Sequence, residues 1–214
     1  MKTKRFIDFI SRVAIFGSLA VILYCIPYLQ FALPFTPSFL KIHFDEIPIL
    51  IAGYAYGPGV SFAIIILKGL IKLIQDIPET GGIGVLTDVL YSSAFILPAA
   101  FIYKKHRSLK GAIISFSVGA LSQLIMSSVV GLYTIYPLYG FFFNPQAKTY
   151  DEAMVTVGYL FSALDNRIET AKDPRIMYEF LLPFNLIKNG IVGLVTFLTY
   201  KPLEIFLQKK NSSK

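Results

Sequence analysis

The side chains that could do chemistry in this chain are a few polar residues set against apolar segments. Asp45 and Glu46 stand together at the start of an apolar run, and Asn185 and Lys188 lie three residues apart in another. Lys68 lies deep in a third. Charges at the centre of a bilayer are expensive and face a cavity or a partner. An amide beside an ammonium group offers donors and an acceptor, which would suit a small solute with a flat, polar edge.

Each of these residues also has an ordinary structural interpretation. Asn185 and Lys188 could satisfy one another and nearby carbonyl groups, and Lys68 could pair with an acid instead of serving a ligand. Lys72, one helical turn from Lys68, could extend its ammonium group to the membrane interface. The residue types alone therefore leave binding and structural roles open.

Recognisable catalytic and metal-binding patterns are missing from the sequence. It contains no HExxH, Walker lysine loop or GxSxG motif. His43 lies near two acids, but one histidine with two acids is a weak metal signal. The single Cys25 excludes an internal disulfide framework and a cysteine metal cluster. We therefore expect a binding protein without catalytic residues, metal or cofactor, and not an enzyme.

The composition is that of an integral membrane protein. The 214 residues are 55% hydrophobic and 15% charged, with a mean hydropathy of +0.62, whereas soluble domains are about 25% charged. At roughly 20 residues for each span, this length allows about six helices and modest loops.

We predict an all-α fold, a compact bundle of six transmembrane helices that forms a single membrane domain over residues 1–214. Prolines and glycines interrupt the apolar runs and mark the loops. The approximate spans are 6–26, 46–57, 60–75, 85–103, 111–136 and 180–200, and the outer loops are 27–45, 76–84 and 143–178.

The charges sort by loop. Basic clusters occupy Met1–Arg12, Lys104–Lys110 and Lys201–Lys214, whereas acids dominate the loops after the first, third and fifth spans. Under the positive-inside rule, both termini are then cytoplasmic. The formal net charge of +7 therefore reflects membrane topology and gives no reason to expect a nucleic-acid partner.

Four segments carry a resemblance to a known family. In order and spacing, FLKIHFDEIPILIAGYAYGPG, TGGIGVLTDVL, AFILPAAFIYKKHRSLKGA and LLPFNLIKNGIV resemble the membrane S components of energy-coupling factor (ECF) vitamin transporters. The likeness covers roughly Ser38–Phe143 and Leu181–Val195 and is greatest to the riboflavin-specific branch.

This resemblance implies a substrate-binding subunit for vitamin uptake in a bacterial cell membrane, a multi-pass protein surrounded by lipid. Its partners would be a transmembrane coupling (T) protein and two cytoplasmic ATPases. The vitamin, riboflavin or a related flavin, would be the transported ligand and not a cofactor. The small residues Ala14 and Ser18 of the first span would dock on the coupling protein.

The resemblance also implies the ligand-binding residues. The ligand-facing loop would contribute Phe39, Leu40, Lys41, Asp45 and Glu46, the third span Lys68, and the last span Asn185 and Lys188.

Two departures bear on the ligand. The riboflavin branch has asparagines where this chain has Gly69 and Gly131, and each lost amide removes hydrogen bonds worth about 0.5–1.5 kcal/mol. A different vitamin, such as pantothenate, folate or thiamine, is therefore an alternative. A stand-alone facilitator of small solutes is another.

Overall fold

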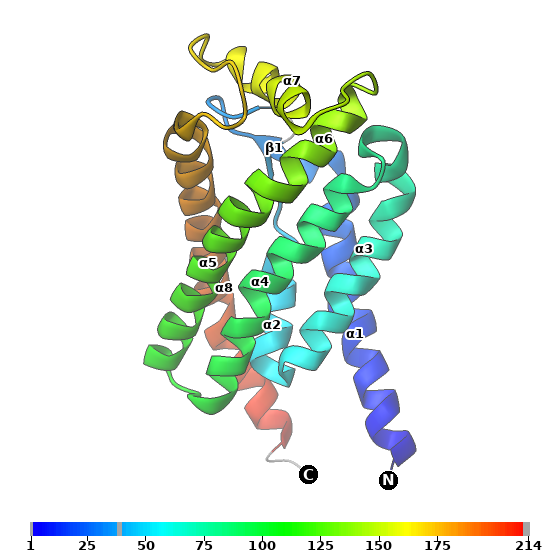
Figure 1. The fold of residues 1–214 in the computed structure, drawn as a ribbon. Coiled ribbons are helices and arrows are strands. Elements are labelled where there is room, and N and C mark those ends of the chain that lie inside the picture. Colours follow the sequence, from blue (N-terminus) through cyan, green and yellow to red (C-terminus); the bar gives the residue numbers. More distant parts are fainter. Residues whose placement is uncertain (1, 38–39, 212–214) are drawn as a thin grey trace.

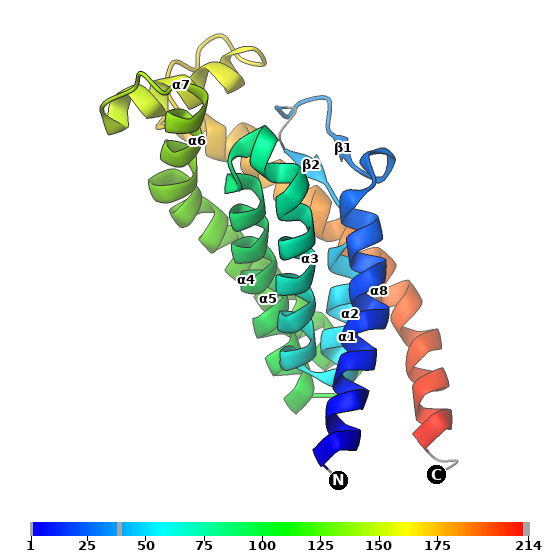
Figure 2. The ribbon, with the colours of Figure 1, turned by 90° about the vertical axis from the view of Figure 1, so that its right-hand side faces the viewer.

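The structure, a computed structural model, describes residues 2–37 and 40–211. It consists largely of helices that run along one long axis, as the two perpendicular views of Figures 1 and 2 show. The helices are α1 (Lys2–Cys25), α2 (Glu46–Tyr56), α3 (Pro58–Thr80), α4 (Ile83–Lys105), α5 (Leu109–Val130), α6 (Tyr136–Phe143), α7 (Tyr150–Ser162) and α8 (Leu182–Asn211).

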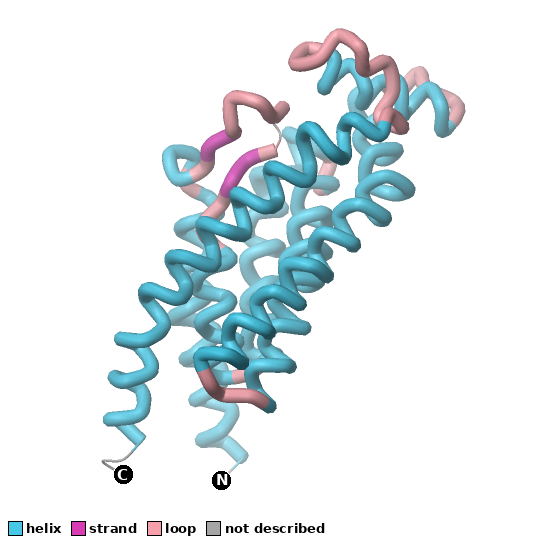
Figure 3. The backbone as a smooth tube through the Cα atoms, turned by 90° about the vertical axis from the view of Figure 1, so that its left-hand side faces the viewer, coloured by secondary structure: helices cyan, strands magenta, loops and turns pink. Residues whose placement is uncertain are grey.

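Short irregular elements lie between the helices. A 3-10 helix, Pro27–Leu29, precedes a two-stranded antiparallel hairpin of β1 (Phe31–Ala32) and β2 (Lys41–Ile42), in which Phe31 pairs with Ile42. The π-helical turns η2 (Gly131–Ile135) and η3 (Ile176–Leu181) join α5 to α6 and lead into α8. The hairpin and α7 lie at one end of the bundle, and the first residues of α1 and the last of α8 lie at the other (Figures 1 and 3).

The helices confirm an all-α membrane protein in outline. Among the described residues, four helical stretches are long and apolar enough to cross a membrane: Thr3–Cys25, Ile83–Lys105, Leu109–Phe143 and Ile176–Thr199. Helix α2 has only 11 residues, and α3 carries Lys68, Lys72 and Asp76 in its length.

Helix α2 lies in the centre of the bundle. Its residues Ile49, Leu50 and Ala52 are fully buried, and helices α1, α3, α4 and α8 all pack against it. The helix ends at Gly57, whose φ of 96° is a conformation that favours glycine. Because α2 is hydrophobic on every side, it is suited to this enclosed position.

The start of α2 departs from the usual pattern of helix capping. Asp45 is its N-cap residue, and aspartate at this position normally accepts a bond from a backbone N–H group of the first turn. Here the Asp45 side chain makes no such bond, because its carboxylate contacts Lys68 of α3. The position of the Asp45 carboxylate is therefore set by its contact with Lys68 and not by capping of α2.

The turn between α3 and α4 is shorter than the expected loop 76–84. Helix α3 continues to Thr80, and Gly81 and Gly82 make the turn with φ of 65° and 88°. The buried carboxylate of Asp76 accepts bonds from Thr80 Oγ1 at 2.6 Å and from the Val85 backbone at 3.1 Å. Asp76 thus satisfies an N–H group at the start of α4.

The long polar segment 144–178 forms a folded cap. Helix α7 and the residues after it share a hydrophobic cluster with α6 and η3, which includes Met154, Phe161, Ile168 and Phe180. Leu40, beside β2, packs against the same cluster. The cap therefore reaches the hairpin at the same end of the bundle.

Candidate functional site

A buried network of ion pairs lies at the start of α2. Lys68, fully buried in α3, contacts the carboxylates of Asp45 and of Asp88 in α4, the latter at 2.8 Å. Its ammonium group also donates to Ser92 Oγ at 3.4 Å. An ammonium group has three N–H donors, and the hydrogen bonds to Asp45 and Ser92 engage two of those of Lys68.

The same network continues from Glu46 to α5 and α8. Lys188 donates to Glu46 Oε1 at 2.8 Å, and the Gln123 side-chain amide donates to the same oxygen at 3.2 Å. The Ser92 hydroxyl lies within reach of Glu46 Oε1, at 3.3 Å, and of Asp88, at 3.5 Å. Five helices therefore converge on one polar cluster that is buried inside the bundle.

Several acceptors of this cluster have no donor among the described residues. They are Asp45 Oδ1, Glu46 Oε2 and Gln123 Oε1, on side chains that are at most 1% exposed. Asp88 Oδ2 also has no hydrogen bond, although it lies in ion-pair contact with Lys68. Buried polar atoms are normally paired, because an unpaired one loses its hydration without compensation. These acceptors are therefore available to hydrogen-bond donors from outside the cluster.

Aromatic groups flank the cluster on its α1 side. The Lys68 ammonium nitrogen lies 4.6 Å from the centre of the Tyr24 ring, and the ring of His43 is 5.0 Å from that of Tyr24. A cation over an aromatic face is stabilised by the ring quadrupole. Charged, polar and aromatic groups thus meet in one region below the hairpin.

The remaining residues expected in the ligand site are placed as follows. Leu40 is half-buried and Lys41 is exposed. Phe39 lies outside the described residues. Asn185 is buried and donates from its amide nitrogen to the carbonyl of Leu181, one turn earlier in α8, at 2.9 Å. Asp45, Glu46, Lys68 and Lys188 are the ones that the fold brings into a single network.

The small residues proposed for partner docking lie on the surface. Ala14 and Ser18 are both exposed on α1, and large apolar side chains, including Ile15, Leu19 and Ile22, are exposed beside them. A small-residue face with apolar neighbours allows another helix to approach closely within a membrane.

Sequence reasoning did not place Asp88, Ser92 and Gln123 in the site. In the sequence, Asp88 lies near the start of the expected span 85–103, where an acid suits a helix N-terminus, yet its carboxylate contacts Lys68. The sequence does contain an indication of a polar face here, because Asp88 and Ser92 are one turn apart on α4 and so lie on the same side of the helix. Gln123 stands in an apolar helix, where a polar side chain needs a partner.

The two glycines at which asparagine was expected both pack closely against α4. A Cβ atom at Gly69 would lie 2.8 Å from Val89 Cγ2, and one at Gly131 would lie 3.0 Å from the Tyr91 hydroxyl. Space for a larger side chain is therefore restricted at both positions in this chain.

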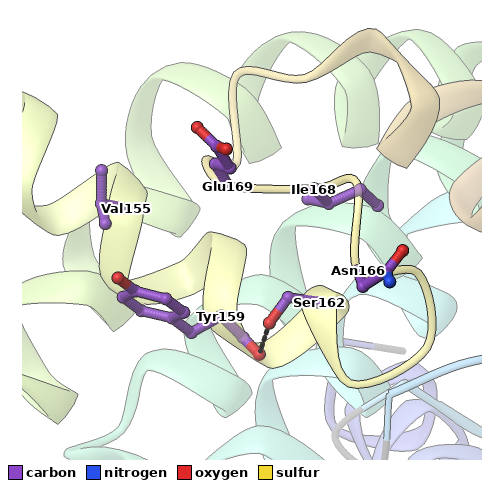
Figure 4. Close-up of a pocket in the computed structure, with 6 residues that line it drawn as sticks. All are labelled: Val155, Tyr159, Ser162, Asn166, Ile168 and Glu169. Carbon is purple, nitrogen blue, oxygen red and sulfur yellow. Dashed lines mark hydrogen bonds between the residues drawn. The ribbon is translucent and has the colours of Figure 1, made fainter.

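A cavity of about 500 Å³ lies elsewhere, on the outer surface of the cap. It is lined by residues of α7 and the following loop, among them Tyr159, Asn166 and Glu169 (Figure 4). Ser162 donates to the Tyr159 carbonyl at its floor. The cavity is open to solvent and separate from the buried network.

Together, a helical membrane bundle and a buried cluster with unmet acceptors define a membrane-embedded binding protein. A model of the family "ECF transporter, substrate-specific component" matches residues 8–200, and the chain belongs to this family. It is thus a component of a transport system and not an enzyme.

Individual relatives match over nearly the whole chain. Riboflavin transporter FmnP of Bacillus subtilis (strain 168) is 26% identical over 205 residues, 95% of this chain and 97% of the relative. Riboflavin transporter RibU of Staphylococcus aureus (strain TCH60) is 25% identical over 199 residues, 93% of each.

A solved structure described as the S component of a bacterial ECF transporter has the same fold. It superposes with a TM-score of 0.67 at 23% sequence identity, over 97% of this chain and 99% of that one.

Proposed function

We propose that this chain is the riboflavin-binding S component of an ATP-driven importer in a bacterial cell membrane. The observation that carries the ligand assignment is the match, over more than nine-tenths of the chain, to riboflavin transporters of two bacteria. The buried cluster supports it independently, because charges inside a membrane bundle are expensive and mark solute sites.

In this proposal the chain crosses the membrane six times with both termini in the cytoplasm. The common end of α1 and α8 (Figure 1) and the exposed basic residues of the α4–α5 loop, from Lys104 to Lys110, support this orientation under the positive-inside rule. The hairpin and the cap then face the outside, where the vitamin enters.

The binding residues divide by role. Lys188 has donors left over after its bond to Glu46 and can bind an acceptor on the ligand. Lys68 forms ion pairs with Asp45 and Asp88, so its role is to hold these two carboxylates in place. Asn185 is one turn from Lys188 on the same helix face. Leu40 and Lys41 lie in the loop that would face the ligand.

Energy would come from a transmembrane coupling protein and two cytoplasmic ATPases. The exposed small residues Ala14 and Ser18 are suited to docking on the coupling protein. A stand-alone facilitator is the competing function, and co-purification of the chain with ATPases would distinguish the two.

A different vitamin remains the second candidate ligand, favoured by the glycines at positions 69 and 131. An absorption spectrum of the detergent-purified protein, followed by fluorescence titration with riboflavin, tests the choice. We expect visible flavin absorption or saturable quenching of flavin fluorescence at low protein concentration. A colourless protein that does not respond to riboflavin would refute the flavin assignment and leave family membership intact.

A further inference from the structure

Helix α5 turns its small and polar side chains toward the bundle and its aliphatic ones outward. The buried residues that recur every four positions are Ser115, Gly119, Gln123 and Ser127. The exposed residues that recur at the same interval on the outer face are Leu121, Ile125 and Val129. Lipid tails are as apolar as leucine, so a helix in a membrane can expose aliphatic residues and bury small and polar ones. The outer face of α5 is therefore a lipid-facing surface.

An exposed tyrosine ends this aliphatic surface at the cap end of the bundle. Tyr133, four residues after Val129, lies in the turn η2 and is 69% exposed. A second helix repeats the order, since Tyr178 lies in η3 and is 67% exposed. The exposed aliphatic residues that follow Tyr178 at multiples of four are Leu186, Leu194 and Leu198. Ser128 Oγ donates to Met177 Sδ at 3.3 Å, so η3 lies beside the end of α5.

Each of the two surfaces has the length of the hydrocarbon layer of a bilayer. Ile113 and Tyr133 are 20 residues apart, and so are Tyr178 and Leu198. At 1.5 Å per residue this separation is about 30 Å, the usual thickness of the hydrocarbon core. Basic residues stand three positions beyond the far end of each stretch, at Lys110 and Lys201. The tyrosines and the lysines therefore lie at opposite limits of the apolar surface.

Charged side chains of the cap begin directly beyond Tyr133. The hydroxyl of Tyr150, the first residue of α7, donates to the carbonyl of Leu132 at 3.3 Å. Lys172 pairs with Asp151, and its ammonium nitrogen lies 4.9 Å from the centre of the Tyr150 ring. A tyrosine between exposed aliphatic groups and charged groups is typical of the membrane–water interface.

We propose that Tyr133 and Tyr178 contact the lipid headgroups at the cap end of the bundle and fix both ends of the cap there, with α7 outside the hydrocarbon core. The chain has 13 tyrosines and no tryptophan, so tyrosine alone takes the interfacial position that the two residue types commonly share. Its ring is apolar enough for the upper acyl chains, and its hydroxyl can hydrogen-bond the headgroups. Residues 134–177, which include α6 and α7, connect the two tyrosines at the end of the bundle away from the termini (Figure 1). This placement is independent of the vitamin that is bound and of the side of the membrane that the cap faces.

Because the chain contains no tryptophan, a single introduced tryptophan reports the depth of its own position. Tyr133→Trp and Tyr178→Trp test the proposed interface, and Ile125→Trp, eight residues from Tyr133, places the fluorophore about 12 Å deeper. Tyr159→Trp places it on the exposed face of α7. Each full-length variant is measured in nanodiscs of phosphatidylcholine that is brominated either near the headgroup or near the methyl end of its acyl chains. Quenching is expressed relative to the same variant in unbrominated lipid, which cancels quenching by any bound flavin.

We expect shallow bromine to quench Tyr133→Trp and Tyr178→Trp at least about twofold more strongly than deep bromine, and Ile125→Trp in the opposite order. Tyr159→Trp should lose less than about a tenth of its fluorescence in either lipid. Stronger quenching of Tyr133→Trp or Tyr178→Trp by deep bromine would overturn the interfacial assignment, and so would the lack of quenching at both positions. Quenching of Tyr159→Trp as strong as theirs would overturn the placement of α7 outside the hydrocarbon core.

Discussion

Replacement of Lys68 by methionine tests whether the ion-pair network stabilises the bundle. Lys68 is fully buried, and the carboxylate of Asp45 beside it is 1% exposed. Methionine has a similar length and no charge, so Lys68→Met leaves Asp45 and Asp88 as neighbouring carboxylates without their shared cation.

The expected loss of unfolding free energy follows from the removal of this shared cation. Removal of one partner from a buried ion pair typically destabilises a protein by about 3–5 kcal/mol, because the remaining charge is uncompensated. Replacement of the whole buried network by uncharged groups is often close to neutral. The triple variant Lys68→Met, Asp45→Asn, Asp88→Asn should therefore recover most of the stability that Lys68→Met loses.

The assay is the free energy of unfolding in mixed micelles of mild detergent and sodium dodecyl sulfate. Lys72→Met is the matched control, since Lys72 lies one turn further along α3, is half-buried and donates to Gln75 at 3.1 Å. It should cost less than about 1 kcal/mol. Equal losses for Lys68→Met and Lys72→Met, or no recovery in the triple variant, would refute the reasoning.

Three other predictions concern packing, docking and the cap. Gly119→Ala should destabilise the bundle by about 1–3 kcal/mol in the same assay, because its Cβ would lie 2.3 Å from a carbonyl oxygen of α4. Ala14→Leu should leave flavin binding intact and lower uptake by cells, since it places a larger side chain on the exposed surface proposed for docking. Arg175→Ala should increase hydrogen exchange in the cap, because Arg175 bonds the Arg167 carbonyl at 2.8 Å. The side-chain bond from Arg167 lowers the pKa of Asp165, so cap protection should persist from neutral pH down to about pH 4 and decrease only as the pH falls further.

The packing, docking and cap predictions can each be contradicted by a specific result. Gly190→Ala should be nearly neutral, because nothing lies within 4 Å of its Cβ position, and equal effects at Gly119 and Gly190 would contradict close helix packing as the cause. Normal uptake in Ala14→Leu would remove α1 from the docking face. Exchange in the cap that rises already between pH 7 and pH 5 would show that the bond to Asp165 does not govern its stability.

Local chemistry in the sequence determined much of the architecture. The low content of charge and the long apolar runs predicted a membrane protein, because apolar stretches of that length are suited to crossing a bilayer. They predicted helices, because a backbone in lipid must satisfy its hydrogen bonds within the segment. The glycine pair at 81–82 predicted a turn, and both residues adopt the left-handed conformation there. Asp45 and Glu46 also identified the start of α2 as a place where charge is concentrated.

Only the tertiary structure decided how the polar residues combine. Glu46 meets Lys188 across 142 residues and Gln123 across 77, and Lys68 meets Asp45 and Asp88 on two other elements. Spacing within one helix reports which residues share a face, but it contains no information about which faces meet. The sequence by itself therefore determined the class of protein and showed which charged residues stand within or beside apolar segments. The packing of α2 among its neighbours decided that Lys68 pairs with carboxylates of the protein and that Asp45 Oδ1 and Glu46 Oε2 have no donor among the described residues.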